Sequence, residues 1–273
     1  MISLLLISIP VGFLGALTGL GGASILVPIL VFLGIPVKEA IACGMASIIA
    51  TSSGSASFYV REKIANVRVA MFLEMFTTVG AILGATITTV ISPVLLYFFF
   101  AAFLATSFLK SRGRGSESFS TPEWNDRVSR WLDLQGGYFD EVHQRRIEYK
   151  VNHPLLGGGG MFVAGMAAGM LGIGAGAFKV TVQENILKLP PKVSSTTSNF
   201  IIGMTALAGT SVYLYSGLLN LTLMAPMAVG TTIGAFLGGR MLNRLGNRAL
   251  RLLFFAIVTF LIGQMLYKGV SSL

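Results

Sequence analysis

The sequence is poor in charge, in cysteine and in histidine. Only 11% of its 273 residues are charged, against roughly 25% in a soluble domain. The single cysteine, Cys43, excludes an intramolecular disulfide and a thiolate cluster. Both histidines, His143 and His153, lie in the polar middle of the chain, which argues against a haem or a histidine-rich metal centre. We therefore expect no cofactor and no metal.

The sequence is rich in apolar residues. They make up 53% of the chain, and the mean hydropathy is +0.76. A soluble chain of this length needs more polar surface than that, so the composition predicts an all-α integral membrane protein. The net charge of +9 is scattered between apolar runs, which argues against a nucleic-acid partner. The apolar start, 1–10, has no basic region before it, so we expect no removable signal peptide.

Six apolar runs are long enough to cross a bilayer, which takes about 20 residues. They cover 38–60, 67–91, 93–110, 192–216, 221–244 and 248–268. Two further apolar stretches, 2–33 and 155–187, are each interrupted by glycines. Only about 11 residues follow each break, too few to span about 30 Å at 1.5 Å per residue. We predict that these two stretches are broken helices or helical hairpins.

The chain contains an internal repeat. Matching positions in its two halves are 154 residues apart, and 153 apart at the glycine breaks. Tyr59 and Asn66 of the first copy match Tyr213 and Asn220 of the second. Longer matches join 19–23 to 172–176, 35–38 to 189–192, and 80–84 to 234–238. Such repeats are typical of secondary transporters. We divide the chain into a first repeat (1–110), a polar connector (111–153) and a second repeat (154–273).

The distribution of basic residues indicates that the two repeats are inverted. Loop 61–68 carries three basic residues and its counterpart 216–221 carries none, whereas loop 91–93 is uncharged and its counterpart 240–251 carries four. If each broken segment enters and leaves on one side, the connector and both basic loops share a side. The positive-inside rule places that side in the cytoplasm and both termini outside the cell. We read the arginines of 240–251 as determinants of this topology.

The connector holds 7 of the 11 acidic residues, so it is expected outside the bilayer. Thr121-Pro122 is a plausible helix start, and Trp124, Val128 and Trp131 follow on one face, which predicts a short amphipathic helix on the membrane surface. Residues 147–151 alternate between apolar and charged, a strand pattern. The connector is interpreted as a small ordered link rather than as a regulatory or partner-binding element.

Several segments together resemble a known family. The stretch Gly19 to Pro28 (GLGGASILVP), its copy Gly172 to Val180, and the run 189–193 followed by 197–200 resemble the sulfite exporter (TauE/SafE) family of membrane transporters. The resemblance implies secondary transport of sulfur-containing anions such as sulfite, thiosulfate or sulfonates. The second repeat departs from the pattern, because Thr181 stands where proline is expected.

The glycine breaks suggest where an anion binds. Unpaired backbone groups in a membrane are tolerated only where they line a cavity, and each half-helix begins with free N–H groups and a positive dipole end. Two such ends near the midplane would form an anion site, although the glycines also suit close helix packing. The substrate-binding residues predicted at the breaks are Gly19, Gly21, Gly22, Ala23, Ser24, Gly172, Gly174 and Gly176.

Polar residues beside the second break extend the predicted site. Lys179 stands where the first repeat has Leu26, and an ionisable residue at membrane depth is a functional candidate. It either attracts the anion or extends to the cytoplasmic face to pair with Glu184. Hydroxyl and amide groups can replace water around an oxyanion, and from span 192–216 we add Thr197, Ser198 and Asn199 to the predicted substrate site.

Glu74 is the only acidic residue in the interior of an ordinary span, and its counterpart is Ala228. It either carries a proton in proton-coupled transport or forms an ion pair with Arg68 at the membrane interface. The ion pair is favoured because Arg68 lies only about one and a half turns away.

The sequence therefore predicts an inverted-repeat secondary transporter, each repeat being a glycine-broken hairpin plus three spans, in the cytoplasmic membrane. Its partners are lipid and a small anion, a sulfur oxyanion or an organosulfonate of the sulfoacetate kind, moved by alternating access with a proton or ion gradient. An anion channel and a membrane scaffold are the alternatives. An enzyme is excluded because the spans contain no paired acids, no histidine and no nucleophile–base pair.

Overall fold

The segment predicted as the first repeat forms five helices in the computed structural model: α1 (Ile2–Thr18), α2 (Ala23–Phe32), α3 (Val37–Arg61), α4 (Val67–Val90) and α5 (Pro93–Arg112). The connector contains α6 (Arg127–Trp131), β1 (Gln135–Asp140) and β2 (Arg145–Lys150). The second repeat contains α7 (Pro154–Leu171), α8 (Gly176–Asn185), α9 (Pro191–Tyr215) and α10 (Leu221–Met241). The structure describes residues 2–18, 22–61, 65–112, 127–140, 145–241, 259–260 and 262–271.

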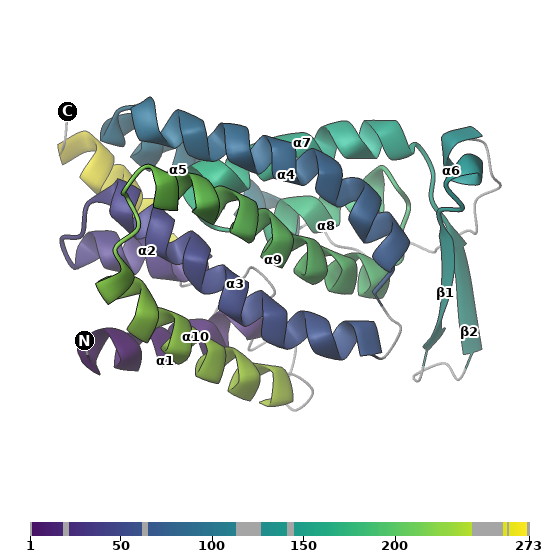
Figure 1. Ribbon diagram of the computed structural model, residues 1–273, viewed down its shortest axis with the longest axis horizontal. Helices are drawn as coiled ribbons and strands as arrows, with labels where there is room; N and C mark the ends of the chain where they lie inside the picture. Colours follow the sequence, from purple (N-terminus) through teal and green to yellow (C-terminus); the bar gives the residue numbers. More distant parts are fainter. Residues whose placement is uncertain are drawn as a thin grey trace.

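The helices form a bundle with the connector at one end (Figure 1). The start of α1 and the helical residues 262–271 lie at the opposite end. Helices are confirmed at the predicted spans 38–60, 67–91, 93–110 and 192–216 and over most of 221–244. Most of the predicted span 248–268 falls outside the described residues.

Both glycine-broken segments are divided into two helices, as predicted. α8 has ten residues, so it reaches about 15 Å, half the thickness of a bilayer core. α7 starts and α8 ends at the connector end, where the Asn152 N–H donates to the Leu187 carbonyl at 3.2 Å. The segment 154–187 therefore returns to the end at which it begins.

Two of the described helices, α4 and α7, are both long enough and apolar enough to cross a membrane. α3 and α9 have 25 residues each, a length of about 37 Å, but they carry many hydroxyl side chains. Several of these hydroxyl residues are buried, namely Ser47, Ser194, Thr197, Ser198 and Thr205. Among the predicted spans that the structure describes, the helices are therefore alike in being long but unlike in apolarity.

α4 is apolar on its outer face and polar on its inner face. Met71, Met75, Val79 and Val90 have exposed fractions between 53% and 83%, whereas Glu74 on the opposite face is 9% exposed. A water-soluble helix has the reverse pattern. An apolar outer stripe with a buried ionisable residue is typical of a helix that faces lipid.

Glycines let α1 pack on α10 and α7 pack on α4 at backbone distance. A Cβ on Gly12 would overlap the Thr231 backbone, and a Cβ on Gly165 would overlap the Thr77 backbone. These two contacts are equivalent in the repeat, since Gly12 corresponds to Gly165 and Thr77 to Thr231. Each broken segment therefore packs on a span of the other repeat, in the manner of small-residue membrane interfaces.

α3 and α9 contact each other in antiparallel directions. Ser52 of α3 donates to the Asn199 carbonyl at 2.6 Å, while Met45, earlier in α3, lies against Gly209, later in α9. A second reciprocal pair supports the correspondence of the repeats. The Cys43 Sγ lies 3.7 Å from the Asn220 carbonyl, and in the other repeat the Asn66 N–H donates to Thr197 at 3.1 Å.

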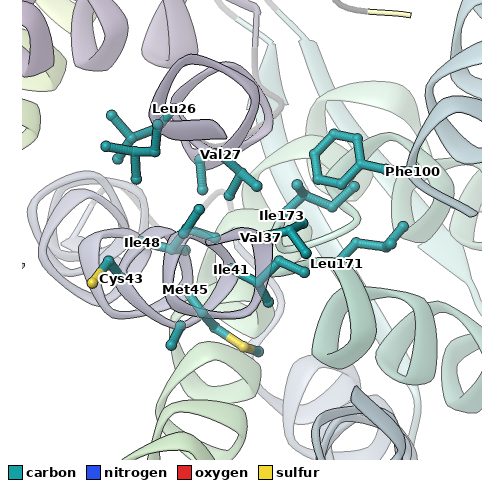
Figure 2. Packing of buried hydrophobic residues seen from close by; sticks show 14 of the residues in the cluster. Leu26, Val27, Val37, Ile41, Cys43, Met45, Ile48, Phe100, Leu171 and Ile173 are labelled. Atoms are coloured by element: carbon teal, nitrogen blue, oxygen red, sulfur yellow. The ribbon is translucent and has the colours of Figure 1, made fainter. Parts of the chain in front are cut away.

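The larger hydrophobic core surrounds α3, as Figure 2 shows. Leu26 and Val27 of α2 pack beside it, together with Phe100 of α5 and Ile173 of the second break. A second core cluster joins α4, the connector and the second repeat through Leu73, Tyr138, Met161, Leu187 and Val193. The larger cluster includes Ala23, which follows the first break, and Leu171 and Ile173 at the second, so it fixes these residues relative to α3.

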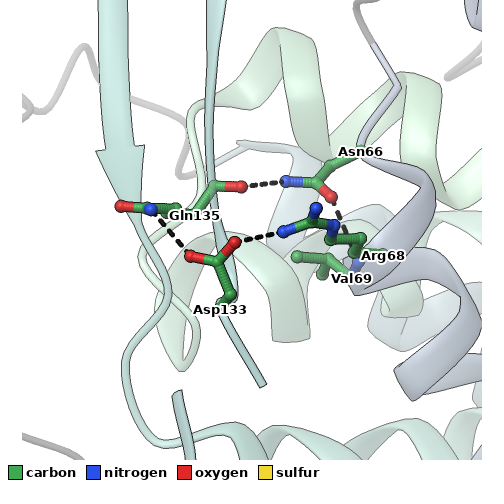
Figure 3. A network of polar contacts seen from close by, with 5 residues as sticks. All are labelled: Asn66, Arg68, Val69, Asp133 and Gln135. Carbon is green, nitrogen blue, oxygen red and sulfur yellow. Dashed lines mark hydrogen bonds and ion pairs between the residues drawn. The ribbon is translucent and has the colours of Figure 1, made fainter. Parts of the chain in front are cut away.

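The connector docks on the end of α4 through a polar network (Figure 3). Arg68 pairs with Asp133, and the Asn66 amide donates to the Gln135 carbonyl at 3.1 Å. The Asn66 side chain also accepts from the Val69 N–H, which caps α4. The expected Arg68–Glu74 ion pair is therefore wrong, because the connector supplies Arg68 with a nearer carboxylate.

Strands β1 and β2 of the connector pair in antiparallel directions, with Tyr138 opposite Ile147. The strand predicted at 147–151 is confirmed as β2, whereas β1 was not predicted. Burial raises the pKa of the Tyr149 phenol above its ordinary value, and the hydrogen bond from the Asn66 amide, 3.0 Å long, lowers it by less. The predicted amphipathic helix is described only over 127–131, where Trp131 is exposed, and Trp124 lies outside the described residues.

Candidate functional site

The second glycine break is held in a left-handed backbone conformation. Gly172 and Gly174 have φ values of +66° and +68°, and Ala175, which precedes α8, has φ +50°. Such values are uncommon for a residue with a side chain, so Ala175 is a local strain that the surrounding packing must maintain. Gly174 lies between Ile48 of α3 and Ile202 of α9. The break is thus wedged between the two central helices.

The first break is described from Gly22 onward, and Gly19 and Gly21 fall outside the described residues. Gly22 has right-handed helical angles (φ −37°), and its carbonyl accepts from the Leu26 N–H at 3.0 Å. Ala23 and Ser24 are buried in the first turn of α2. The Ser24 hydroxyl is buried and has no hydrogen-bond partner in the described structure.

The two breaks approach each other at one position of α3. A Cβ on Gly44 would lie 3.5 Å from the Gly172 carbonyl oxygen and 3.6 Å from the Cβ of Ala23. Ser198 of α9, the counterpart of Gly44, lies 3.4 Å from the Gly176 carbonyl. Both breaks are therefore at the centre of the bundle, against α3 and α9.

Lys179 lies in the first turn of α8 and has no exposed surface. Its ammonium group donates to the Thr205 hydroxyl of α9 at 2.8 Å. It does not extend to the surface, since six residues of α8, about 9 Å, separate it from the end of that helix. A buried cation close to the positive end of a helix dipole is in an unfavourable field, which a nearby negative charge relieves.

Glu74 of α4 provides that negative charge. The Thr205 hydroxyl oxygen lies 3.3 Å and 3.4 Å from the two carboxylate oxygens of Glu74. On α4 itself, Thr78 donates to Glu74 at 2.7 Å and Thr77 lies within 3.0 Å of it. Lys179, Thr205 and Glu74 therefore form a buried chain across three helices, which we call the charge cluster.

The remaining predicted residues of α9 are placed differently from Lys179. Thr197 accepts from the Asn66 N–H and Ser198 reaches the second break, while Asn199 is half-buried and contacts Ser52 through its carbonyl. The sequence reasoning missed Thr205. The signal was available, because Thr205 lies two helical turns beyond Thr197 on the same face of α9, in an otherwise apolar stretch.

Gln183 is a further residue of this face of α8. It stands four residues after Lys179, on the same side of the helix, and has no exposed surface. Neither its amide nitrogen nor its amide oxygen has a hydrogen-bond partner in the described structure. A buried amide with two unsatisfied atoms is costly unless something else pairs with it.

Comparison with known protein families agrees with a bundle of membrane helices. The family described as Sulfite exporter TauE/SafE matches residues 4–265. The chain belongs to the sulfite exporter TauE/SafE family. It is a membrane transporter and not an enzyme.

Two relatives from Bacillus subtilis (strain 168) are similar over most of this TauE/SafE chain. The "Probable membrane transporter protein YunE" is 23% identical over 98% of both chains. The "Probable membrane transporter protein YdhB" is 26% identical over 87% of both chains. No solved structure matches.

Proposed function

We propose that the protein is a secondary transporter of a small anion, a sulfur oxyanion or an organosulfonate. The observation that carries this proposal is the fully buried Lys179 in the first turn of a half-helix that begins at a glycine break. The cation and the helix end attract the same kind of ligand, an anion. A fixed pair of positive groups at membrane depth serves neither packing nor solubility.

The proposed substrate site lies where the two breaks meet α3 and α9. It comprises Lys179, the hydroxyl and amide groups of α9, and the backbone of both half-helices. The residues concerned are Gly19, Gly21, Gly22, Ala23, Ser24, Gly172, Gly174, Gly176, Thr197, Ser198 and Asn199. The closeness of Gly44 to both breaks supports a single shared site rather than two separate ones.

Inverted repeats are part of the proposal. The reciprocal contacts relate the two repeats by a two-fold exchange, and α3 and α9, which correspond, run antiparallel. Both observations support a two-fold axis in the membrane plane. A connector at one end of the bundle and the start of α1 at the other support a cytoplasmic connector and external termini in the cytoplasmic membrane.

Alternating access would then move one set of helices against another around the fixed site. Because α1 packs on α10 and α7 on α4, each moving unit takes a broken segment from one repeat and a span from the other. A reporter fused to either terminus should be accessible from outside, and one inserted near Ser118 from the cytoplasm. Termini on opposite sides would contradict the inversion.

Anion flux into proteoliposomes tests the function. The substrates are sulfite, thiosulfate, sulfate, sulfoacetate and acetate, each with and without a pH gradient. We expect saturable uptake of a sulfur anion that Lys179→Ala abolishes and that Lys150→Ala, an exposed lysine of β2, leaves unchanged. Unsaturable passage of acetate and sulfate alike would favour a channel, and a folded protein that moves none of these anions would contradict the proposal.

A further inference from the structure

The charge cluster is electrically balanced. Among the buried residues of the described structure, Glu74 and Lys179 are the two that carry a formal charge, and their signs are opposite. Glu74 comes from the first repeat and Lys179 from the second. The lysine needs an anionic counter-charge, and Glu74 supplies it through Thr205.

The surroundings of Glu74 contain few other charges. The described part of α7 has no titratable residue, and on α4 itself Arg68 is paired with Asp133. α8 carries Glu184 as well as Lys179. The titratable or charged residues of α9 and α3 lie elsewhere along those helices; they are Lys192, Tyr213 and Tyr215 in α9, and Lys38, Glu39, Cys43, Tyr59 and Arg61 in α3. Lys179 is therefore the charge that balances Glu74.

An arriving anion changes this balance. Lys179 would then face two negative groups, the substrate and the Glu74 carboxylate, and the buried cluster would carry a net charge of −1. Net charge at membrane depth is strongly unfavourable. A proton that binds a carboxylate oxygen of Glu74 restores neutrality, with no other bond formed or broken.

We infer that the protein carries one proton with each monovalent anion, the anion on Lys179 and the proton on Glu74. This inference rests on the proposed function and adds its coupling. The empty carrier is neutral as the Lys179–Glu74 pair, and the loaded carrier is neutral as lysine, anion and protonated Glu74. Both forms can rearrange in the membrane, whereas a carrier with only the anion or only the proton cannot do so readily.

Thr205 positions the exchange. Its hydroxyl accepts from Lys179 and has one proton to donate, either to Glu74 or to the Ile201 carbonyl at 2.7 Å. When Glu74 is ionised, Thr205 donates to the carboxylate. When Glu74 is protonated, the new O–H donates to Thr205, which turns its own proton to Ile201. The hydroxyl can therefore serve both charge states without leaving a buried group unpaired.

Gln183 offers the anion a neutral partner. Its unpaired and buried amide lies one helical turn from Lys179 on the same face of α8. The amide N–H group can donate to a second oxygen of the substrate without altering the charge balance. A substrate oxygen paired with this amide would satisfy a buried group that has no partner among the described residues.

The stoichiometry is measured with methanesulfonate, a monovalent strong-acid anion that carries no proton of its own. Proteoliposomes with an internal pH dye and a potassium–valinomycin clamp report proton flux, anion flux and voltage dependence together. We expect one proton per anion, uptake driven by an inward pH gradient, and no response to voltage. If methanesulfonate enters without protons and the rate follows the voltage, the inference is overturned while the proposed function stands. If no panel anion moves either, both fail.

Two variants locate the coupling. Glu74→Gln, which mimics the protonated acid, should keep anion exchange but lose at least tenfold in pH-driven uptake, and its net uptake should become voltage-dependent. Thr205→Val should uncouple the fluxes, and Thr205→Ser should restore one proton per anion. A Glu74→Gln protein with unchanged pH-driven uptake overturns the inference. If that variant does not fold, an unchanged proton-to-anion ratio in Thr205→Val, relative to Thr205→Ser, overturns it instead.

Discussion

α2 and α8 occupy equivalent places in the two repeats, yet their chemistry differs. Each has ten residues and follows a glycine break. In α2, Leu26 and Leu30 are buried within the hydrophobic core. In α8, the corresponding positions hold Lys179 and Gln183, equally buried but polar. The two half-helices therefore have similar lengths and positions, while at these two positions the charged and amide side chains belong to α8.

Comparing α2 with α8 separates the residues that the fold requires from the residues that the function requires. An apolar half-helix such as α2 satisfies the packing of a broken segment. The polar residues of α8 bring no packing advantage, since a buried charge pair is often no more stabilising than apolar residues of similar volume. We infer that the α8 residues are retained for binding, and each prediction below tests α8 against α2.

The largest effect is expected when α8 is made to resemble α2. Lys179→Leu leaves Glu74 buried and unpaired, which should destabilise the protein by about 3–5 kcal/mol. In the double variant Lys179→Leu with Glu74→Ala, each position receives the residue of its counterpart in the other repeat. Leucine is the residue at Leu26, the counterpart of Lys179, and alanine is the residue at Ala228, the counterpart of Glu74. The double variant should recover the thermal midpoint but not anion uptake. Uptake restored in the double variant would contradict the assignment.

The two breaks should differ in their tolerance of a side chain. Gly172→Ala places a Cβ at positive φ and against the Ile41 carbonyl, so about 1–3 kcal/mol of stability should be lost. Gly22→Ala has a helical φ and only a 3.3 Å approach to the Val11 carbonyl, and should cost less than about 1 kcal/mol. Thermal unfolding in lipid measures both. The control, Gly159→Ala in α7, meets open space, and equal losses at 22 and 172 would contradict the comparison.

The unpaired polar groups of the two half-helices should contribute unequally to affinity. Gln183→Leu removes two potential hydrogen bonds and should raise KM about tenfold, whereas Ser24→Ala removes one and should raise it about threefold. Uptake kinetics for the preferred anion measure both values. If neither KM changes while the thermal midpoints rise, the two groups are unsatisfied for structural reasons and do not contact the substrate.

The smallest effect is expected in the connector, which docks beside α8 and not beside α2. Tyr149→Phe removes the hydrogen bond from Asn66 and should cost about 0.5–1.5 kcal/mol. Because burial raises the Tyr149 pKa, the phenol contributes fully below about pH 10 and less as the pH rises through its raised value. Thermal midpoints at pH 7 and pH 10.5 test this. A wild-type midpoint that increases at the higher pH would contradict the direction.

Much of the fold could be predicted from the sequence because it depends on local patterns. The apolar runs predicted the helices, and the glycines predicted both breaks and their short half-helices. The contact of Thr205 with Glu74 and the Arg68–Asp133 pair could not be predicted in the same way. Each depends on which distant segment lies nearby, a tertiary fact that spacing along one helix does not contain. The ionic partner expected for Glu74 was wrong for this reason, since the nearest arginine in sequence is held by the connector.

The packing of α1 on α10 has a consequence for biosynthesis. The glycine face of α1 that contacts Thr231 is made early, but its partner follows more than two hundred residues later. At about 5–20 residues per second, α1 waits roughly 10–45 s in the membrane before α10 is synthesised. α7, by contrast, meets α4 as soon as it emerges. Assembly of the bundle should therefore begin with α4 and α7, and the first helix to be made should be among the last to reach its final place.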